Sequence, residues 1–359
     1  MTARRNGREK QKDLTMARDK AMPETSAVPR GKPTLKTIAQ ISGLAVPTVS
    51  RALNDAPDIG QATKSLVRRI ARDIGYVPNR AGVRLRTGRT NVISLVMPTE
   101  HDMMNHTARL ISSVAGGLRD TPFHLIVTPF FPDQDPLEPV RYIVETGSAD
   151  AVIFNQIRPQ DPRVAYLMEK GFPFATHGRT DWAAQHPYYD FDNHTFGQLA
   201  ARNLAARGRK SLLLIAPPQV QNYAQHMTAG MQEAATELGL HMQLADAVTS
   251  DASGQDVVAY VKRALRADPA IDGIVCASTS SAMAAVAGLE QHGATVGREI
   301  DVFAKEAIPF LKLFRADILT ISEKVGTAGT FLGQAAIQAI RDPGAPPMQH
   351  LEVPTAPEI

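Results

Sequence analysis

The sequence contains many side chains that could perform acid–base or metal chemistry, but none of them forms a recognisable catalytic pattern. Its 36 carboxylates and 10 histidines are scattered along the chain. The single cysteine, Cys276, provides neither a disulfide nor a thiolate cluster for a metal. Walker-type, G-x-G-x-x-G and G-x-S-x-G motifs are absent. The sequence therefore predicts a binding protein rather than an enzyme, with no cofactor and no metal.

The strongest chemical signal is a cluster of arginines. Residues 78–90 read PNRAGVRLRTGRT, with Arg80, Arg84, Arg86 and Arg89 around Leu85. A flexible linker would be rich in Gly and Ser, and a rigid spacer would be rich in Pro or strongly helical. This segment is neither. Its charge suits a phosphate-rich partner, although a linker with solubilising charge remains the alternative.

Charge divides the chain into two parts. Residues 1–90 carry 19 Lys and Arg against 7 Asp and Glu, a balance of +12, and the remaining 269 residues carry 20 against 29, a balance of −9. Phosphates are bound by charge neutralisation and counterion release, so we expect a polyanionic partner for the N-terminal part only. A solvated tail that binds nothing is the alternative.

Composition predicts a soluble, globular protein of two or three compact units, with 43% apolar and 21% charged residues. No apolar run is long enough for a membrane span, and residues 1–32 lack the apolar region of a secretory signal. We interpret residues 1–32 as a disordered basic arm. One cysteine favours a reducing, cytoplasmic environment.

Residues 33–78 have the pattern of a helix-turn-helix unit. In TLKTIAQISGLAVPTVSRALN, Thr34 can cap a first helix, Gly43 can end it, and Pro47 falls in the first turn of a second helix. A third helix is expected over residues 61–74, with its basic side chains outside: Lys64, Arg68, Arg69 and Arg72. The second helix would present Thr48, Ser50 and Arg51 to the major groove of DNA.

This motif chain, continued by RRIARDIGYVPNR, LRTGRT and VISLVMP, resembles the lactose-repressor family of bacterial transcription regulators from about Thr34 to Pro98. The resemblance implies that residues 79–90 form a hinge helix on DNA and that Leu85 enters the minor groove as a wedge. It also implies a recognition helix that reads bases and phosphates. The DNA-binding set that we predict is Thr34, Val46, Pro47, Thr48, Ser50, Arg51, Asn54, Asn79, Arg80 and Leu85.

Four positions depart from the family pattern in this region. Ala45 replaces the usual Ser cap, which should cost the helix start about 0.5–2 kcal/mol. Val46 and Pro47 are apolar where sequence is read, which favours thymine methyl contacts or DNA shape. Gly82 replaces the commoner Ala, so we expect a hinge that folds only on binding.

Residues 91–359 alternate short apolar runs with helical patterns, which is typical of parallel sheets with right-handed crossovers. Strands are expected at 92–98, 123–130, 150–155, 173–178, 211–218, 242–248, 273–278 and 301–306. Two such runs predict two lobes, with the chain crossing between them near residues 188–193 and again near 320. The resemblance implies the same architecture: an all-α helix-turn-helix head joined to a two-lobe α/β body of the periplasmic-binding-protein type, which binds an effector and dimerises.

Ligands of open α/β sheets bind beyond the carboxyl ends of the strands, so the cleft between the lobes is the expected effector site. Polar groups there, with Phe130 or Trp182 nearby, would suit a sugar. The effector-binding residues that we predict are Thr99, Phe130, Asn155, His177, Arg179, Asp192, His226, Ser278, Glu306 and Glu323.

The body also departs from the family pattern. Met227 stands where an Arg is usual, and AKE replaces GFD, which makes Glu306 the matching carboxylate. PFATHGRT and HMTAG are similar to a subgroup that responds to oligosaccharides such as α-glucosides.

We therefore expect a dimeric, sugar-controlled repressor that binds double-stranded operator DNA. A sugar-processing enzyme with a DNA-binding head and a solute-binding transport protein are the alternatives. The C-terminal stretch has no leucine heptads, so a helical tetramerisation tail is not expected.

Overall fold

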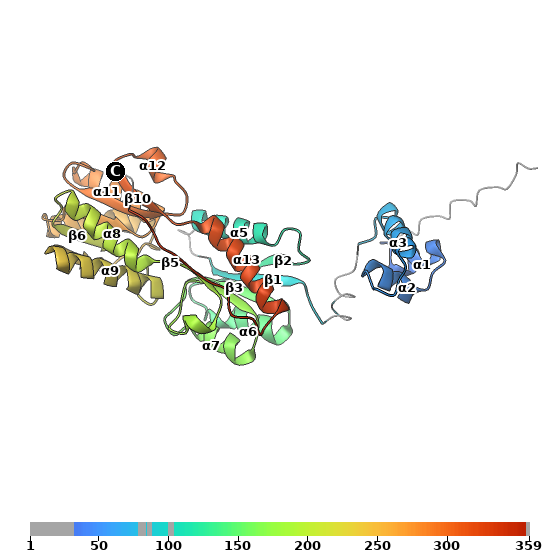
Figure 1. Cartoon of the computed structure of the whole chain (residues 1–359). Coiled ribbons are helices and arrows are strands. Elements are labelled where there is room, and N and C mark those ends of the chain that lie inside the picture. The colour runs from blue at the N-terminus through green and yellow to red at the C-terminus, as the bar shows by residue number, and fades with distance from the viewer. Residues whose placement is uncertain (1–31, 78–83, 85–87, 100–103, 357–359) are drawn as a thin grey trace, which may run out of the picture. The chain divides into compact units, whose positions relative to one another are not determined.

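The computed structural model describes residues 32–77, 84, 88–99 and 104–356 (Figure 1). The chain divides into two compact units, residues 1–87 and residues 88–359. No helix in the described part of the chain has the length and apolar character needed to cross a membrane.

The first unit is a three-helix head. Its helices are α1 (Leu35–Ser42), α2 (Val46–Leu53) and α3 (Gln61–Asp73). Thr34 caps α1 through a capping box with Thr37, and Gly43 ends it at a φ of 69°, a left-handed conformation that favours glycine. The head core consists of buried apolar residues from all three helices: Ile38, Val49, Ala52, Val67, Ile70 and Ala71. The predicted helix-turn-helix is confirmed.

Two details of the head concern its capping and its charges. Ala45 precedes α2 and provides no side-chain cap, because its methyl group cannot accept a hydrogen bond. The expectation that Lys64 faces solvent is wrong, because this residue is buried with only 8% of its surface exposed. Its Nζ lies 3.2 Å from the Asp55 backbone oxygen and 3.1 Å from Asp55 Oδ1. A lysine of α3 thus stabilises the turn after α2, which helical periodicity alone does not reveal.

The second unit, called the body here, contains two parallel sheets. The first-lobe sheet has the order β11-β5-β4-β3-β1-β2 and the second-lobe sheet the order β10-β9-β8-β6-β7. The first-lobe strands are β1 (Val92–Pro98), β2 (His124–Phe130), β3 (Ala151–Phe154), β4 (Phe174–His177), β5 (Tyr188–Phe191) and β11 (Gln349–Glu352). The second-lobe strands are β6 (Ser211–Ile215), β7 (His241–Leu244), β8 (Gly273–Cys276), β9 (Asp301–Glu306) and β10 (Ile318–Ser322).

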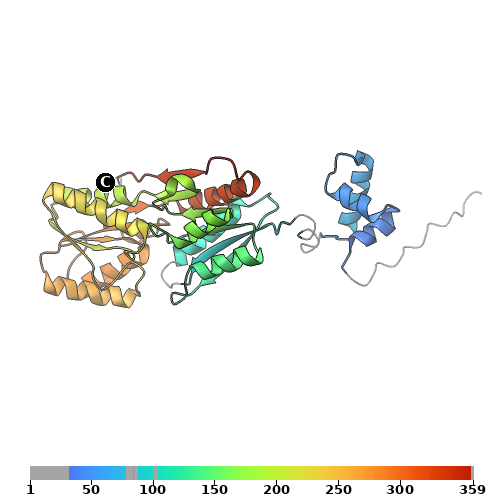
Figure 2. The ribbon, with the colours of Figure 1, turned by 90° about the horizontal axis from the view of Figure 1, so that it is seen from below.

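Helices cover both faces of each sheet (Figures 1 and 2). The first lobe carries α5 (Met104–Gly117) and α13 (Val325–Arg341) on one face, and α6 (Leu137–Thr146) and α7 (Pro162–Lys170) on the other. The second lobe carries α8 (Asn193–Ala206) and α9 (Asn222–Leu238) opposite α10 (Gly254–Ala267) and α11 (Thr279–His292). A short turn, η2 (Ala183–Gln185), precedes β5, and α12 (Leu311–Phe314) precedes β10. This is the predicted two-lobe α/β architecture.

Two segments in the described part of the chain connect the two sheets. The chain leaves the first lobe after β5, enters the second lobe at α8, and returns between β10 and α13. Six elements were not predicted from the sequence: the strands β5, β10 and β11, the helices α12 and α13, and the short turn η2. The segment at 188–193 was expected only as a connection, but its first four residues form β5, which pairs with β11 along its whole length and with β4 at Tyr188 and Tyr189.

Close contact between α8 and α9 depends on two glycines. A Cβ added at Gly230 would lie 2.0 Å from the backbone oxygen of His194, and one at Gly197 would lie 2.3 Å from the backbone oxygen of Met227. Any side chain at either position would force the two helices apart. These helices begin beside the crossing segment, so their packing positions the second lobe at the cleft.

Candidate functional site

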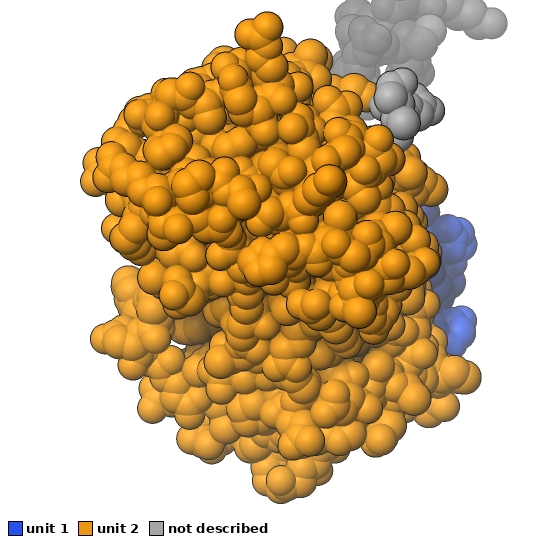
Figure 3. All heavy atoms as spheres, turned by 90° about the vertical axis from the view of Figure 1, so that its left-hand side faces the viewer, with its two compact units in different colours: residues 1–87 blue, residues 88–359 orange. Residues whose placement is uncertain are grey.

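A polar cleft lies between the two lobes at the carboxyl ends of their strands, where the fold class places ligands. It contains about 900 Å³ of empty space, part of it open to solvent. Figure 3 shows one face of the body, which is hollowed between an upper and a lower mass of atoms.

Four of the ten predicted effector-binding residues line this cleft. Asn155 and His177 follow β3 and end β4 in the first lobe, and Ser278 caps α11 in the second lobe. Glu323 follows β10 in the second crossing segment. Sequence reasoning missed further polar and aromatic residues of the lining: His106, Gln156, Asp190, Phe191, Asn193, Tyr223, Ser250, Asp251 and Lys305.

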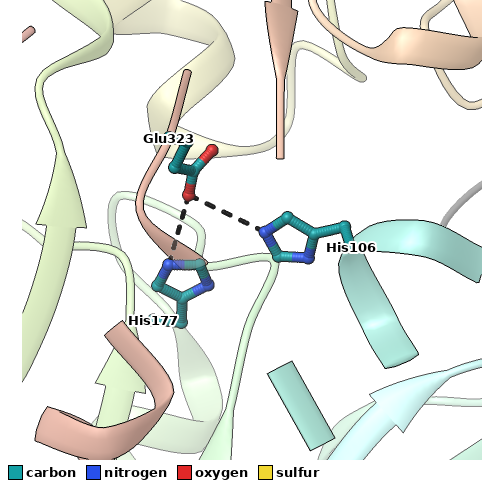
Figure 4. A group of neighbouring side chains, drawn as sticks. All are labelled: His106, His177 and Glu323. Atoms are coloured by element: carbon teal, nitrogen blue, oxygen red, sulfur yellow. Dashed lines mark ion pairs between the residues drawn. The ribbon is translucent and has the colours of Figure 1, made fainter. Parts of the chain in front are cut away.

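Glu323 is the centre of a charged cluster in the cleft (Figure 4). Its Oε1 lies 3.3 Å from His177 Nε2 and 3.7 Å from His106 Nε2, and both rings point toward it. Its Oε2 lies 3.0 Å from Nζ of Lys305. His106 comes from α5 and Lys305 from β9, so the cluster joins side chains of both lobes at the crossing segment. We call these four residues the Glu323 cluster.

The protonation states of the cluster follow from its surroundings. Burial alone would raise the pKa of Glu323, but Lys305, together with the two histidines, holds that pKa well below its ordinary value. Burial lowers the pKa of His106, so its ring is neutral near pH 7. The cleft therefore contains an ionised carboxylate with a fixed ammonium on one side and imidazole rings on the other.

Two buried polar atoms of the lining have no hydrogen-bond partner within the described residues: His106 Nδ1 and Asn155 Oδ1. Buried polar groups are normally satisfied, and leaving one unsatisfied costs about 1–3 kcal/mol. Such atoms in a cleft are suited to bind a polar ligand. The Phe191 and Tyr223 rings, which lie 5.1 and 5.6 Å from Lys305 Nζ, add apolar faces to the same cleft.

Six predicted effector-binding residues do not line the cleft. The Thr99 backbone N–H donates to the Phe130 carbonyl at 3.0 Å, and Phe130 is buried in the core beside α6. Asp192 caps α8 by accepting from the Thr195 backbone N–H at 3.1 Å. The remaining three are Arg179, His226 and Glu306.

Arg179 and Glu306 are engaged elsewhere. Arg179 Nε donates to Asp190 Oδ2 at 2.6 Å, so Arg179 supports the cleft through a lining residue. Glu306 Oε2 accepts from the Leu311 backbone N–H at 3.0 Å, which holds the start of α12. Side chains alternate along a strand, so Lys305 rather than its neighbour Glu306 faces the cleft from β9. The alternation of side chains along this strand was the sequence signal that could have identified Lys305 as a cleft residue.

In the head, the predicted DNA-binding residues lie on and beside α2. Pro47, Arg51 and Asn54 are exposed, and Val46, Thr48 and Ser50 are half-buried. Thr34 is exposed at the start of α1. Three further predicted residues, Asn79, Arg80 and Leu85, lie outside the described residues.

Two of the exposed polar groups of α2 have contacts within the head. Arg51 forms an ion pair with Asp58, and Asn54 Nδ2 donates to the Ser50 backbone oxygen at 2.5 Å. The side chains of the ion pair remain about half exposed, 58% for Arg51 and 48% for Asp58. Exposed pairs of this kind contribute little stability, so the guanidinium can be redirected to a phosphate or a guanine at small cost.

A helix-turn-helix head on a chain whose body has a polar cleft between two lobes defines a class: transcription regulators that carry a ligand-binding domain. Residues 34–79 match the pattern of "Bacterial regulatory proteins, lacI family". Residues 106–339 match "Periplasmic binding proteins and sugar binding domain of LacI family". The chain belongs to the lacI family of bacterial regulatory proteins.

Two named relatives are similar in sequence to this chain over most of its length. "HTH-type transcriptional regulator AglR" of Rhizobium meliloti is 31% identical over 325 residues, which cover 88% of this chain and 90% of that protein. "HTH-type transcriptional regulator RafR" of Escherichia coli is 29% identical over 80% of this chain and 85% of that protein.

Two solved structures share the fold. One, of a "transcriptional regulator CelR-cellobiose complex", has a TM-score of 0.66 and 22% identity, covering 90% of this chain and 98% of that one. The other, the Lac repressor dimer bound to operator and the anti-inducer ONPF, has a TM-score of 0.77 and 16% identity, covering 91% of this chain and 98% of that one.

Proposed function

We propose that this protein is a dimeric transcription repressor whose affinity for operator DNA is controlled by a sugar bound in the interlobe cleft. The observation that carries the proposal is the presence, in one chain, of a DNA-reading head and a cleft with buried, unpartnered polar atoms. The printed names of the relatives support it, because AglR and RafR are transcriptional regulators and the CelR structure contains cellobiose. A protein that binds operator DNA works in the bacterial cytoplasm, where we place it.

On DNA, α2 would read the major groove through Thr48, Ser50 and Arg51, with Val46 and Pro47 contacting thymine methyls or responding to groove shape. Leu85 would enter the minor groove from the hinge, flanked by arginines on phosphates. Two heads of a dimer would bind a pseudo-palindrome, because the two-fold symmetry of a dimer matches that of the site.

In the cleft, the sugar would contact both lobes and so favour one relative position of the lobes over another. A ligand shifts an equilibrium only by its different affinity for the two states. Binding at one site then changes affinity at the other by the same coupling free energy, in both directions. Asn155, His177, Ser278 and Glu323 are the predicted residues that we assign to the sugar contact.

The proposal is tested by operator binding of the full-length protein with and without a panel of mono- and disaccharides. We expect one sugar to change operator affinity at least tenfold, a coupling of about 1.4 kcal/mol. Arg51→Ala and Leu85→Ala should each weaken operator binding and leave the sugar-induced melting shift unchanged. Full operator affinity in both variants, or an absence of any sugar effect on operator binding, would contradict the proposal.

A further inference from the structure

We propose that the Glu323 cluster and its neighbour Asn155 select neutral, polyhydroxylated sugars as the effector and exclude phosphorylated and acidic sugars. This inference rests on the proposed function and specifies the ligand class of that cleft. It follows from the donors, acceptors and charges that the cleft presents, which are considered in turn.

The first argument concerns hydrogen-bond polarity. The ring nitrogen of His106 that faces Glu323 is Nε2, 3.7 Å from Oε1. Because a carboxylate only accepts hydrogen bonds, this contact favours the tautomer with the proton on Nε2. In the neutral ring Nδ1 is then an acceptor, and this atom is buried without a partner within the described residues. Asn155 Oδ1, also buried and unpartnered there, is a second acceptor. The cleft therefore requires ligand donors, and hydroxyl groups supply them.

The second argument concerns charge. The lining contains three carboxylates, Asp190, Asp251 and Glu323, and Lys305 is its single Lys or Arg. A phosphate or carboxylate group brings negative charge and acceptors, which meet the same kind of group here. Like charges in this partly enclosed cleft repel more strongly than they would in bulk water.

The third argument is that the available cations already have partners. Lys305 lies 3.0 Å from Glu323 Oε2 and 3.2 Å from Asn193 Oδ1. Arg179, beside the cleft, forms an ion pair with Asp190. An anionic ligand would have to share a cation with the carboxylate that already pairs with it, and that carboxylate would repel it. A neutral sugar can instead donate hydrogen bonds from its hydroxyl groups to the paired carboxylates, because each carboxylate oxygen accepts more than one hydrogen bond.

The fourth argument concerns the position of the carboxylate that meets the ligand. Glu306, the residue that the family pattern matches to such a carboxylate, accepts from the Leu311 backbone and does not line the cleft. Glu323, 17 residues later, does line the cleft. The rings of Phe191 and Tyr223 line the same cleft and can pack on the apolar face of a sugar ring.

The experiment uses the full-length protein and matched pairs of ligands: glucose and glucose 6-phosphate, trehalose and trehalose 6-phosphate, galactose and galacturonate, with maltose, melibiose and cellobiose added. Binding is measured by calorimetry and by thermal shift, with EDTA and with added Zn²⁺. We expect binding among the neutral sugars only, unaffected by EDTA. Tighter binding of a charged member than of its neutral partner would overturn the inference.

Variants then test the residues against the strongest neutral ligand. Glu323→Gln keeps the shape of the side chain, and Asn155→Ala removes one acceptor without touching the ion pairs. We expect each to lower affinity at least about tenfold. Glu233→Gln, at an exposed ion pair with His194, is the matched control and should leave affinity unchanged. Melting temperatures without ligand show whether each variant folds.

The remaining outcomes also decide the question. Neutral-sugar binding that survives both cleft variants would overturn the inference while leaving sugar control of the operator intact. Binding that requires Zn²⁺ and is lost with EDTA would assign His106, His177 and Glu323 to a metal and overturn it as well. A failure of the proposed function would be seen differently, as an absence of any sugar effect on operator binding.

Discussion

Replacing Lys305 by Met should expose the energetic cost of burying the Glu323 carboxylate. Lys305 and Glu323 have 12% and 6% of their side-chain surface exposed, and their charged atoms lie 3.0 Å apart. Removing one partner of such a buried pair typically costs about 3–5 kcal/mol, because the other charge is left in a medium that solvates it poorly. For a unit of this size, that loss lowers the melting temperature by about 10 °C.

The stability that Lys305→Met loses relative to wild type should increase with pH. In the wild-type protein the pKa of Glu323 is well below its ordinary value, since the effect of Lys305 and the histidines exceeds that of burial. In Lys305→Met the largest effect that opposes burial is removed, so we expect the pKa of Glu323 to rise from its wild-type position. A group with a raised folded-state pKa favours the folded state at low pH and loses that contribution as pH rises. The stability gap between variant and wild type should therefore be large at pH 8 and smaller at pH 5.

The assay is urea unfolding of the wild type, Lys305→Met, Glu323→Gln and the double variant at both pH values. The double variant removes both charges, so it should recover most of the stability lost in Lys305→Met. Lys262→Met is the control, at a half-buried lysine whose Nζ donates to the Gln291 side chain at 3.1 Å, and should stay within about 0.5 kcal/mol of wild type. A Lys305→Met protein as stable as wild type at pH 8, or a double variant no more stable than Lys305→Met, would refute this account of the cluster.

Three further predictions concern other parts of the molecule. Gly230→Ala places a carbon 2.0 Å from a backbone oxygen of α8 and should destabilise the body by about 1–3 kcal/mol. Gly254→Ala, whose added carbon has no neighbour closer than 3.9 Å, is the control and should be tolerated. Thermal unfolding of both variants and of the wild type tests the prediction. Asp161→Ala breaks a buried pair with Arg163, whose charged atoms lie 2.7 Å apart, and should cost about 3–5 kcal/mol at pH 7. The pKa of Asp161 is lowered, because Arg163 outweighs the opposing effect of burial. The wild type therefore loses the stability contributed by the ionised carboxylate as pH falls, and its difference in free energy of unfolding from Asp161→Ala should become smaller in acid. Urea unfolding from pH 7 to 3 measures this difference, and a constant value would contradict the prediction. Ile38→Ala leaves a cavity in the head core, should cost the head about 2–5 kcal/mol and should abolish operator binding while the sugar-induced melting shift of the body persists.

Much of the fold could be predicted because it is determined by local patterns. The head follows from helical spacing, a capping threonine and a turn glycine, all within 40 consecutive residues or so. The central strands of the body are short apolar runs because they are buried on both faces, as β1 and β3 are throughout. The elements that the sequence did not reveal lack such patterns. Helix α13 is rich in Ala and Gly and buried on several sides, so no polar face marks its period.

Pairing partners and side-chain neighbours were decided only by the tertiary structure. Strand β11 is QHLE, a polar segment that becomes a strand because β5 supplies its hydrogen-bonding partner. The cleft combines His106, His177, Lys305 and Glu323 from four separated segments, and no spacing along the chain relates them. The sequence by itself determined which segments are helical or apolar and which end of the chain is basic, because those properties depend on neighbouring residues. Which of the two predicted carboxylates lines the cleft, Glu323 rather than Glu306, depended on strand alternation and on the crossing between lobes.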